Sequence, residues 1–183
     1  LTGDNGTGKS TLLAMLLGER GDEPWRRNLL DGVRLDLPPA VPVGHLAQRL
    51  DDLDGFESAI EAVRDSAPHR TPHDARALLA RFLIRAERAD QPPATMSGGE
   101  RFRVALARVL FADPAPRLLV LDEPTNNLDM TSVEQLVDAL EDFRGALLVV
   151  THDEYLAGRL DITGLWRLSR DGELVASRSD QRP

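Results

Sequence analysis

The sequence predicts an α/β fold with a parallel β-sheet and an inserted helical segment. A glycine-rich loop at residues 3–10 leads directly into a leucine-rich segment with helical spacing. Two apolar runs, 118–121 and 146–150, have the length and composition of strands buried on both faces of a parallel sheet. Helical patterns surround these runs, and such alternation is typical of proteins in which helices cover a parallel sheet.

The composition is that of one globular domain with a small appended subdomain. The chain has 183 residues, of which 42% are hydrophobic, which is enough for one core. Its 22 basic residues are outnumbered by 30 acidic ones, so the net charge is −8. This balance argues against a general nucleic-acid-binding surface, and we expect no direct DNA binding. The absence of cysteine excludes disulfides and thiolate metal sites.

The sequence shows neither a membrane span nor a secretion signal. Its longest apolar runs are far too short to cross a bilayer, and no basic and apolar leader opens it. We therefore expect a cytoplasmic domain without a membrane segment. The glycine-rich loop begins at residue 3, and because such a loop needs a strand that feeds into it, we expect the N-terminal strands to be missing from this sequence.

The first half of the chain contains three predicted helices. Residues 10–17 form a leucine-faced helix closed by Gly18, and the proline-containing stretch 19–43 is irregular. The spacing of Phe56, Ile60 and Val63 predicts a second helix. A third begins at the sequence TPHD, 71–74, with a cap residue and a proline in the first turn. Its predicted apolar stripe consists of Ala75, Leu78, Leu79, Phe82 and Leu83.

The second half contains two helices with predicted capping boxes. The sequence SGGE at 97–100 has the spacing of such a box and opens a helix that runs to about Phe111. The sequence TSVE at 131–134 has the same spacing, and an apolar stripe follows it. Residues 165–175 are predicted to form a strand pair around Asp171-Gly172. We expect residues 1–48 and 96–183 to form one core, with a helical subdomain, 49–95, inserted in it.

The sequence GDNGTGKS at 3–10 fits the phosphate-binding pattern G-x-x-x-x-G-K-[ST]. Its glycines allow backbone N–H groups to close around phosphate oxygens, and the following helix adds its positive end. Lys9 would reach the β- and γ-phosphates, and the hydroxyl of Ser10 would bind Mg²⁺. The alternative is a glycine-rich turn that merely precedes a helix.

Two adjacent carboxylates, Asp122 and Glu123, end the first apolar strand. They are expected at the carboxyl edge of the sheet, where ligands of doubly wound folds bind. Asp122 suits the support of Mg²⁺, and Glu123 suits the polarisation of a water for attack on a γ-phosphate. The alternative is a strand that reaches solvent at an acidic turn. His152 follows the second strand at the same edge, where a histidine by itself is more often structural or exposed.

These motifs occur in a recognisable order: GDNGTGKS, GHLAQ, MSGGE, LLVLDEP, NNLD and VVTHD. Together they resemble the ATP-binding cassette (ABC) ATPases, whose fold is a RecA-like P-loop NTPase core with a helical insert. The resemblance covers essentially the whole chain. It implies binding and hydrolysis of ATP with Mg²⁺ as cofactor, in a site shared with a second cassette.

The resemblance also implies roles for particular residues. Glu123, His152 and Gln48 would be catalytic, and Ser10, Gln48 and Asp122 would serve the metal. The segment 97–100 would be the signature loop, which contacts the ATP held by the partner cassette. The residues that would bind ATP are Gly3, Asp4, Asn5, Gly6, Thr7, Gly8, Lys9, Ser10 and Thr11. The signature loop consists of Ser97, Gly98, Gly99 and Glu100, and the cassette interface of Asn126, Asn127, Leu128 and Asp129.

Within the ABC proteins, the sequence EPTNNLD, Glu100 and the compact insert resemble the ABC-F group. Transporter cassettes more often read SGGQ and TSALD. ABC-F proteins have two cassettes in one chain and no membrane domain, and many act on the ribosome. The motif set particularly resembles the second cassette of bacterial members, including those linked to resistance to ribosome-targeting antibiotics. The implied partners are a second cassette in the same full-length chain and the ribosome.

Two other functions are compatible with these motifs. The chain could be the ATPase subunit of an ABC membrane transporter, in which the helical insert would contact a transmembrane partner. A degenerate cassette that binds ATP only as an assembly clamp is disfavoured, because Lys9, Asp122, Glu123 and His152 are all present.

Overall fold

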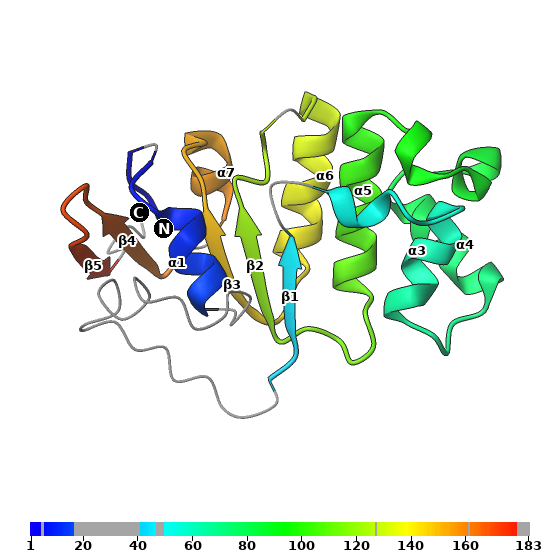
Figure 1. Ribbon diagram of the computed structural model, residues 1–183, viewed down its shortest axis with the longest axis horizontal. Coiled ribbons are helices and arrows are strands. Elements are labelled where there is room, and N and C mark those ends of the chain that lie inside the picture. Colours follow the sequence, from blue (N-terminus) through cyan, green and yellow to red (C-terminus); the bar gives the residue numbers. More distant parts are fainter. Residues whose placement is uncertain (5, 17–40, 47–49, 127, 161, 179–183) are drawn as a thin grey trace.

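The computed structural model describes residues 1–4, 6–16, 41–46, 50–126, 128–160 and 162–178 (Figure 1). Its centre is a parallel sheet of three strands in the order β1 (Val43–Leu46), β2 (Leu118–Asp122) and β3 (Ala146–Val150). Leu118 of β2 lies opposite Val43 on one side and Ala146 on the other. The predicted α/β fold with a parallel sheet is therefore confirmed. The four-residue strand β1 had not been predicted.

Helices cover both faces of this sheet (Figure 1). On one face, Val120 packs in a cluster with Leu12 and Leu13 of α1 (Lys9–Leu16). On the other face, Leu119 and Leu121 pack in a larger cluster with α5 (Gly98–Leu110) and α6 (Met130–Glu141). Successive residues of β2 thus serve two cores, which explains its uninterrupted apolar sequence.

The first two residues lie between β3 and a C-terminal hairpin. The nitrogen of Leu1 donates to the carbonyl of Val149 at 2.6 Å. Thr2 pairs in parallel with Arg167 of β4 (Gly164–Leu168). Strand β4 pairs antiparallel with β5 (Leu174–Arg178), which confirms the predicted hairpin. This position brings the glycine-rich loop to the same edge of the sheet as the carboxyl ends of β2 and β3.

The described part of the predicted insert, residues 50–95, is helical. It consists of η1 (Asp51–Leu53), α3 (Ala59–Ser66), α4 (Pro72–Arg81), η2 (Ala86–Asp90) and η3 (Pro93–Thr95). Its fully buried side chains, such as Leu79 and Ile84, belong to the same apolar cluster as Leu119 of the sheet. The division into core and subdomain at these residues stays a prediction. None of the described helices has the length and apolar character needed to cross a membrane.

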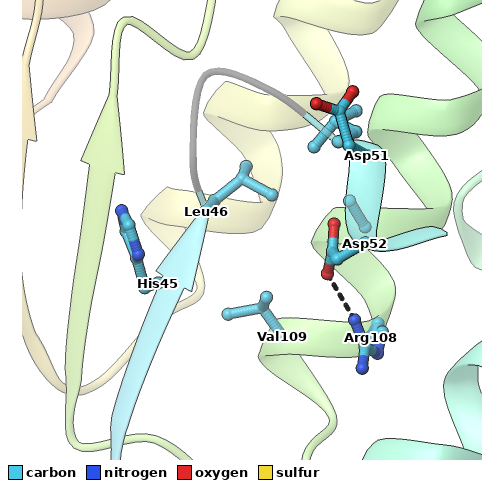
Figure 2. A pocket seen from close by; sticks show the side chains of 8 residues that line it. His45, Leu46, Asp51, Asp52, Arg108 and Val109 are labelled. Atoms are coloured by element: carbon cyan, nitrogen blue, oxygen red, sulfur yellow. Dashed lines mark hydrogen bonds and ion pairs between the residues drawn. The ribbon is translucent and has the colours of Figure 1, made fainter. Parts of the chain in front are cut away.

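Arg108 of α5 ties the insert to the core. Its guanidinium bonds to Asp52 of η1 at 2.5 Å and to Asp65 of α3 at 2.8 Å. Asp52 and Arg108 border a hollow of about 230 Å³ between β1, η1 and α5 (Figure 2). Helix α5 therefore packs against the sheet on one side and against the insert on the other.

The predicted apolar stripe of α4 is wrong at its last residue. The helix ends at Arg81, and Leu83 has a backbone φ of 57° and a side chain that is 42% exposed. The left-handed turn reverses the chain, so that the N–H of Ile84 bonds to the carbonyl of Leu79 at 3.0 Å. Ile84 is fully buried in its place.

The predicted capping box at 131–134 is also wrong. Helix α6 begins at Met130, and Asp129 is its cap, since the Asp129 carboxylate accepts from the N–H of Ser132 at 2.7 Å. An aspartate in this position is as good a cap as a threonine, and here it lies directly after the loop that ends the preceding strand. Helix α7 (Glu154–Arg159) had not been predicted.

Candidate functional site

A cleft of about 800 Å³ opens where the glycine-rich loop meets the carboxyl ends of β2 and β3. Three separate segments of the sequence contribute to it: the loop with the start of α1, the segment after β2, and the segment after β3. Its lining residues are Gly6, Gly8, Lys9, Ser10, Thr11, Glu123, Thr125, Asn126, His152 and Asp153. The topology thus brings together motifs that are more than 100 residues apart in the chain.

The glycine-rich loop has the backbone that an anion cradle requires. Gly6 and Gly8 have φ angles of 81° and 94°, in a region of backbone conformation that residues other than glycine rarely adopt. Helix α1 begins at Lys9, so its first N–H groups face the loop. Asn5 lies outside the described residues.

Lys9 is folded onto this loop. Its side chain is buried, and Nζ donates to the carbonyls of Gly3 at 2.8 Å and Asp4 at 3.0 Å. An ammonium has three N–H donors, and these two bonds fix its position at the cleft wall. A cation held in this way is suited to the β- and γ-phosphates of a nucleotide.

Glu123 has a strained backbone at the end of β2. Its φ is 49°, which is uncommon for a residue with a side chain. Its N–H donates to the carbonyl of Val150, the last residue of β3, at 2.8 Å. This bond ties together the ends of two neighbouring strands and directs Glu123 into the cleft. Such strain is characteristic of functional sites.

Glu123 and His152 form a pair across the strand ends. Nε2 of His152 lies 3.1 Å from Oε1 of Glu123, and the backbone N–H of His152 donates to Oε2 at 3.4 Å. The Glu123 side chain is 14% exposed and that of His152 45%. Both carboxylate oxygens are thereby oriented by one residue, in a side chain that lines the cleft.

The oxygen donors near the cleft fit a magnesium ion that also binds a nucleotide. Asp122 is buried, and its Oδ1 has no hydrogen-bond partner among the described residues. An orphaned buried carboxylate oxygen is suited to a cation. No group of three or more His, Asp or Glu side chains in the described ranges could hold a metal by itself. Mg²⁺ is usually bound through one or two protein groups and substrate phosphates, which agrees with Ser10 and Asp122. Gln48 lies outside the described residues.

Asp122 does not line the main cleft itself. It lines an adjoining groove of about 260 Å³, and Glu123 and Asn126 border both hollows. Gly98 of the predicted signature loop also lies in this groove.

The predicted signature loop does not reach the main cleft. The predicted capping box at the start of α5 is confirmed: Ser97 Oγ accepts from the N–H of Glu100, and the Glu100 carboxylate accepts from the N–H of Ser97 at 2.9 Å. Ser97, Gly99 and Glu100 are absent from the lining of the cleft. This arrangement leaves the start of α5 available to a different molecule.

The residues of the predicted interface segment, 126–129, lie in different surroundings. Asn126 lines the cleft, and Leu128 is half-buried against the main core. Asp129 caps α6, and the hydrogen bonds from Ser132 lower the pKa of its carboxyl below the ordinary value. Asn127 lies outside the described residues.

Two cleft residues, Thr125 and Asp153, had not been singled out from the sequence. Asp153 caps α7, since its carboxylate accepts from the N–H groups of Tyr155 and Leu156 at 2.9 and 3.1 Å. An aspartate that precedes a short segment with helical spacing is a cap signal, and it could have revealed this helix. No local signal separates Thr125 from other loop residues.

Comparisons with known proteins show the family of this chain. The sequence model of the ABC transporter family matches residues 1–126. The chain is 39% identical over 171 residues to ATP-binding cassette sub-family F member 3 of Homo sapiens, a match that covers 91% of this chain and 22% of that protein. It is 39% identical over 157 residues to the probable ATP-binding protein YheS of Haemophilus influenzae, covering 85% of this chain and 23% of that one. The chain therefore spans less than a quarter of the length of these relatives.

Solved structures share the fold. The dimeric structure of MJ0796, a bacterial ABC transporter cassette, superimposes with a TM-score of 0.70 at 21% identity, covering 97% of this chain and 83% of that one. A post-hydrolysis dimer of MJ0796 bound to ADP and Pi gives a TM-score of 0.69 at 22% identity. At these identities the likeness establishes the architecture alone.

Proposed function

This chain belongs to the ABC transporter family, and on that premise we propose that it binds ATP with Mg²⁺ and hydrolyses it in a site completed by a second cassette. The observation that carries the proposal is the joint placement of Lys9, Glu123 and His152 around one cleft. A fixed cation that binds the phosphates and a carboxylate that can orient the attacking water are groups that phosphoryl transfer to water uses, and His152 holds that carboxylate in place.

Each group has a role that follows from its contacts. The N–H groups of the loop and Nζ of Lys9 bind the β- and γ-phosphates. Ser10 and Asp122, with Gln48, would hold Mg²⁺, which neutralises phosphate charge when bound. Glu123 orients and polarises the attacking water. His152 holds the Glu123 carboxylate through the 3.1 Å contact, and it would face the γ-phosphate of a bound nucleotide.

A second cassette would complete the site. The signature loop does not line the cleft of its own chain. The start of α5 nevertheless offers backbone N–H groups and the hydroxyl of Ser97 to an anion. We assign these groups to the ATP of the partner cassette, and Asn126, Asn127, Leu128 and Asp129 to the contact between cassettes. The dimeric cassettes of MJ0796 support this arrangement. A single cassette should then turn over ATP poorly.

The protein is further proposed to be a cytoplasmic ABC-F protein that acts on the ribosome, as a translation factor or in antibiotic resistance. The support is the sequence EPTNNLD and the likeness to sub-family F member 3 and to YheS. The family match to ABC transporters and the likeness to a transporter cassette favour one alternative, an ATPase subunit of a membrane transporter.

Fractionation of cell lysate distinguishes these two settings. The full-length protein with the change Glu123→Gln should bind ATP without hydrolysing it, and so remain in its closed, partner-bound form. We expect it to sediment with ribosomes in ATP but not in ADP. Sedimentation with membranes would instead support the transporter alternative and overturn the ribosomal proposal.

The matched control adds Lys9→Ala to Glu123→Gln. Without the Lys9 cation the loop should bind ATP weakly, so the double variant should no longer sediment with ribosomes in ATP. An unchanged affinity for ATP in Lys9→Ala would contradict the role of the loop itself.

A further inference from the structure

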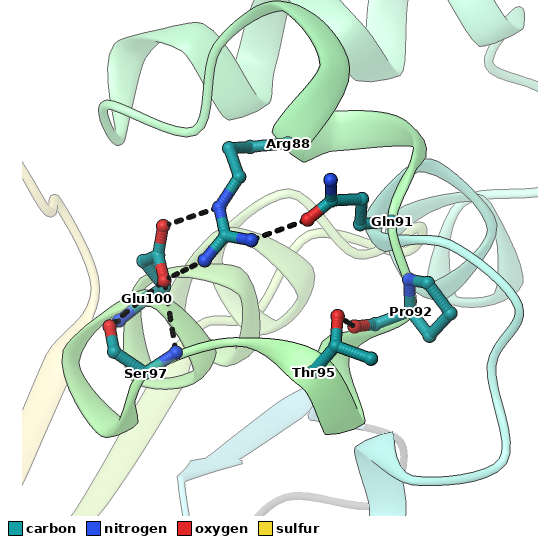
Figure 3. A network of polar contacts seen from close by, with 6 residues as sticks. All are labelled: Arg88, Gln91, Pro92, Thr95, Ser97 and Glu100. Carbon is teal, nitrogen blue, oxygen red and sulfur yellow. Dashed lines mark hydrogen bonds and ion pairs between the residues drawn. The ribbon is translucent and has the colours of Figure 1, made fainter.

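Arg88 joins the helical insert to the start of α5 through Glu100 (Figure 3). Its Nε donates to Oε1 of Glu100 at 2.8 Å, and its Nη2 donates to Oε2 at 2.5 Å. Two such bonds form the bidentate pairing to which a planar guanidinium is suited. The hydrogen bond from Arg88 is the main cause that lowers the pKa of Glu100 to about 2, so Glu100 is ionised at neutral pH.

The guanidinium is held in place by the insert. Its Nη1 donates to the side-chain oxygen of Gln91 (Figure 3). The backbone carbonyl of Gln91 accepts from the N–H of Ala59, at the start of α3, at 3.1 Å. Ala89, the residue after Arg88, is fully buried in the main core. Arg88 therefore has a fixed position relative to α5, although its side chain is 41% exposed.

Capping of α5 does not by itself require an arginine. The box of α5 consists of the reciprocal bonds between Ser97 and Glu100. Helix α4 has the same box, formed by Thr71 and Asp74, and no guanidinium in the described part of the chain hydrogen-bonds to Asp74. The box of α4 forms without such a partner, so Arg88 has a different effect at α5.

That effect is electrostatic. In the proposed composite site the start of α5 meets a phosphate of the partner's ATP, and an unpaired carboxylate there would repel it. The Ser97 hydroxyl also donates to Oε2 of Glu100 at 2.9 Å. The Ser97 hydroxyl must break this hydrogen bond to Glu100 before it can donate one to a phosphate oxygen. The guanidinium of Arg88 neutralises this carboxylate, and its Nη2 shares Oε2 with the Ser97 hydroxyl.

We propose that Arg88 is a positioning residue for the signature loop, which neutralises Glu100 and so lets the Ser97 hydroxyl turn from this carboxylate to the ATP of a second cassette. This inference rests on the proposed function, because it presupposes a site shared between two cassettes. It assigns to the helical insert a direct electrostatic influence on ATP-dependent pairing.

The test compares Arg88→Gln, Glu100→Gln and the double variant in the full-length protein. Arg88→Gln exposes the Glu100 charge, and we expect the ATP concentration for half-maximal turnover to rise roughly tenfold. The double variant carries no charge at either position and should recover most of this loss. Because the effect is a repulsion, it should also shrink as the salt concentration is raised.

The matched control is Arg76→Gln. Arg76 is another arginine of the insert, and it pairs with Asp90 and not with a residue of the signature loop. Its replacement should leave the ATP dependence unchanged. In every variant, binding of ATP to the chain's own loop, measured with a fluorescent nucleotide, should also be unchanged, because Arg88 does not line the cleft.

A merely structural role would give a different pattern. In that case Arg88→Gln would lower the melting temperature, and Glu100→Gln would not rescue turnover. Either an unchanged ATP dependence in Arg88→Gln or the absence of rescue would overturn the proposal. If the unmodified protein shows no cooperative dependence on a second cassette, the proposed composite site fails instead.

Discussion

Glu123 shows how single residues of this site depend on their surroundings. Its φ of 49° is unfavourable by itself, and two partners at the carboxyl end of β3 keep it there. One is the carbonyl of Val150, at the end of β3 itself, which accepts its N–H, and the other is His152, just after β3, which contacts both carboxylate oxygens. The strain is thus stabilised by the neighbouring strand end, and it aims the carboxylate at the cleft.

Glu123→Gln should retain this geometry, because an amide has nearly the same shape, but it removes the negative charge. We expect turnover to fall by roughly 10²–10⁴-fold, the range for a positioned base, while ATP binding persists. Steady-state hydrolysis and nucleotide titration of the full-length protein measure the two effects. The control is Glu154→Gln, because Glu154 is exposed and lies two residues after His152. This variant should hydrolyse ATP at the normal rate. Wild-type turnover in Glu123→Gln would refute the role of Glu123.

At the scale of elements, the start of α5 is packed against the start of α6. A Cβ added to Gly99 would lie 2.9 Å from Oγ of Ser132, which is fully buried and accepts from Arg103 at 2.9 Å. A Cβ added to Gly98 would meet no atom within 4 Å. The two glycines of the signature loop therefore serve different purposes: Gly99 allows close packing of two helices, and Gly98 leaves open space.

Gly99→Ala should consequently lower the free energy of unfolding by about 1–3 kcal/mol, the usual cost of overpacking. Gly98→Ala should be neutral or slightly stabilising in the same measurement, because alanine favours a helix more than glycine does. Denaturant titration of both variants provides the comparison. Equal losses of unfolding free energy in the two variants would show that the contact with Ser132 does not disfavour a side chain at residue 99.

The ion pair of Glu100 predicts a pH dependence of stability. Its pKa in the folded chain is about 2, below the ordinary value of 4.5. The lowered pKa stabilises the fold above about pH 4.5, and this contribution is lost as the pH falls toward 2. The difference in unfolding free energy between the unmodified protein and Glu100→Gln should therefore be constant near neutral pH and shrink below about pH 4.5. A difference that grows in acid would contradict the assigned ion pair.

At the scale of the whole molecule, the insert and the sheet share one core. Leu79 of α4 is fully buried in the cluster that contains Leu119 and Leu121 of β2. Arg108 adds polar bonds from α5 to both η1 and α3. The described part of the chain should therefore unfold as a unit.

Leu79→Ala should then destabilise the sheet as well as the insert, by about 2–5 kcal/mol, as expected for a large-to-small change in a core. Hydrogen exchange of the β2 amides measures the effect far from the substitution. Leu83→Ala is the matched control, because Leu83 is 42% exposed and should change stability little. Faster exchange confined to α3 and α4 would show that the insert unfolds separately.

The sequence by itself determined the local features of this protein. The glycine-rich loop before α1, the capping box at Ser97, the strand at 118–121 and the hairpin around Gly172 all follow from spacings of a few residues, where local geometry dominates. Caps were predicted less well where two residues competed, as Asp129 and Thr131 did. The left-handed turn at Leu83 and the short strand β1 also gave too little local signal.

Only the tertiary structure decided which of these features meet. The pairing of Glu123 with His152 arises because β2 and β3 are neighbouring parallel strands, so that their carboxyl ends lie side by side. The pairing of Arg88 with Glu100 arises because the insert packs on α5. Such contacts depend on the burial of apolar surface shared by distant segments, which no short window of sequence contains.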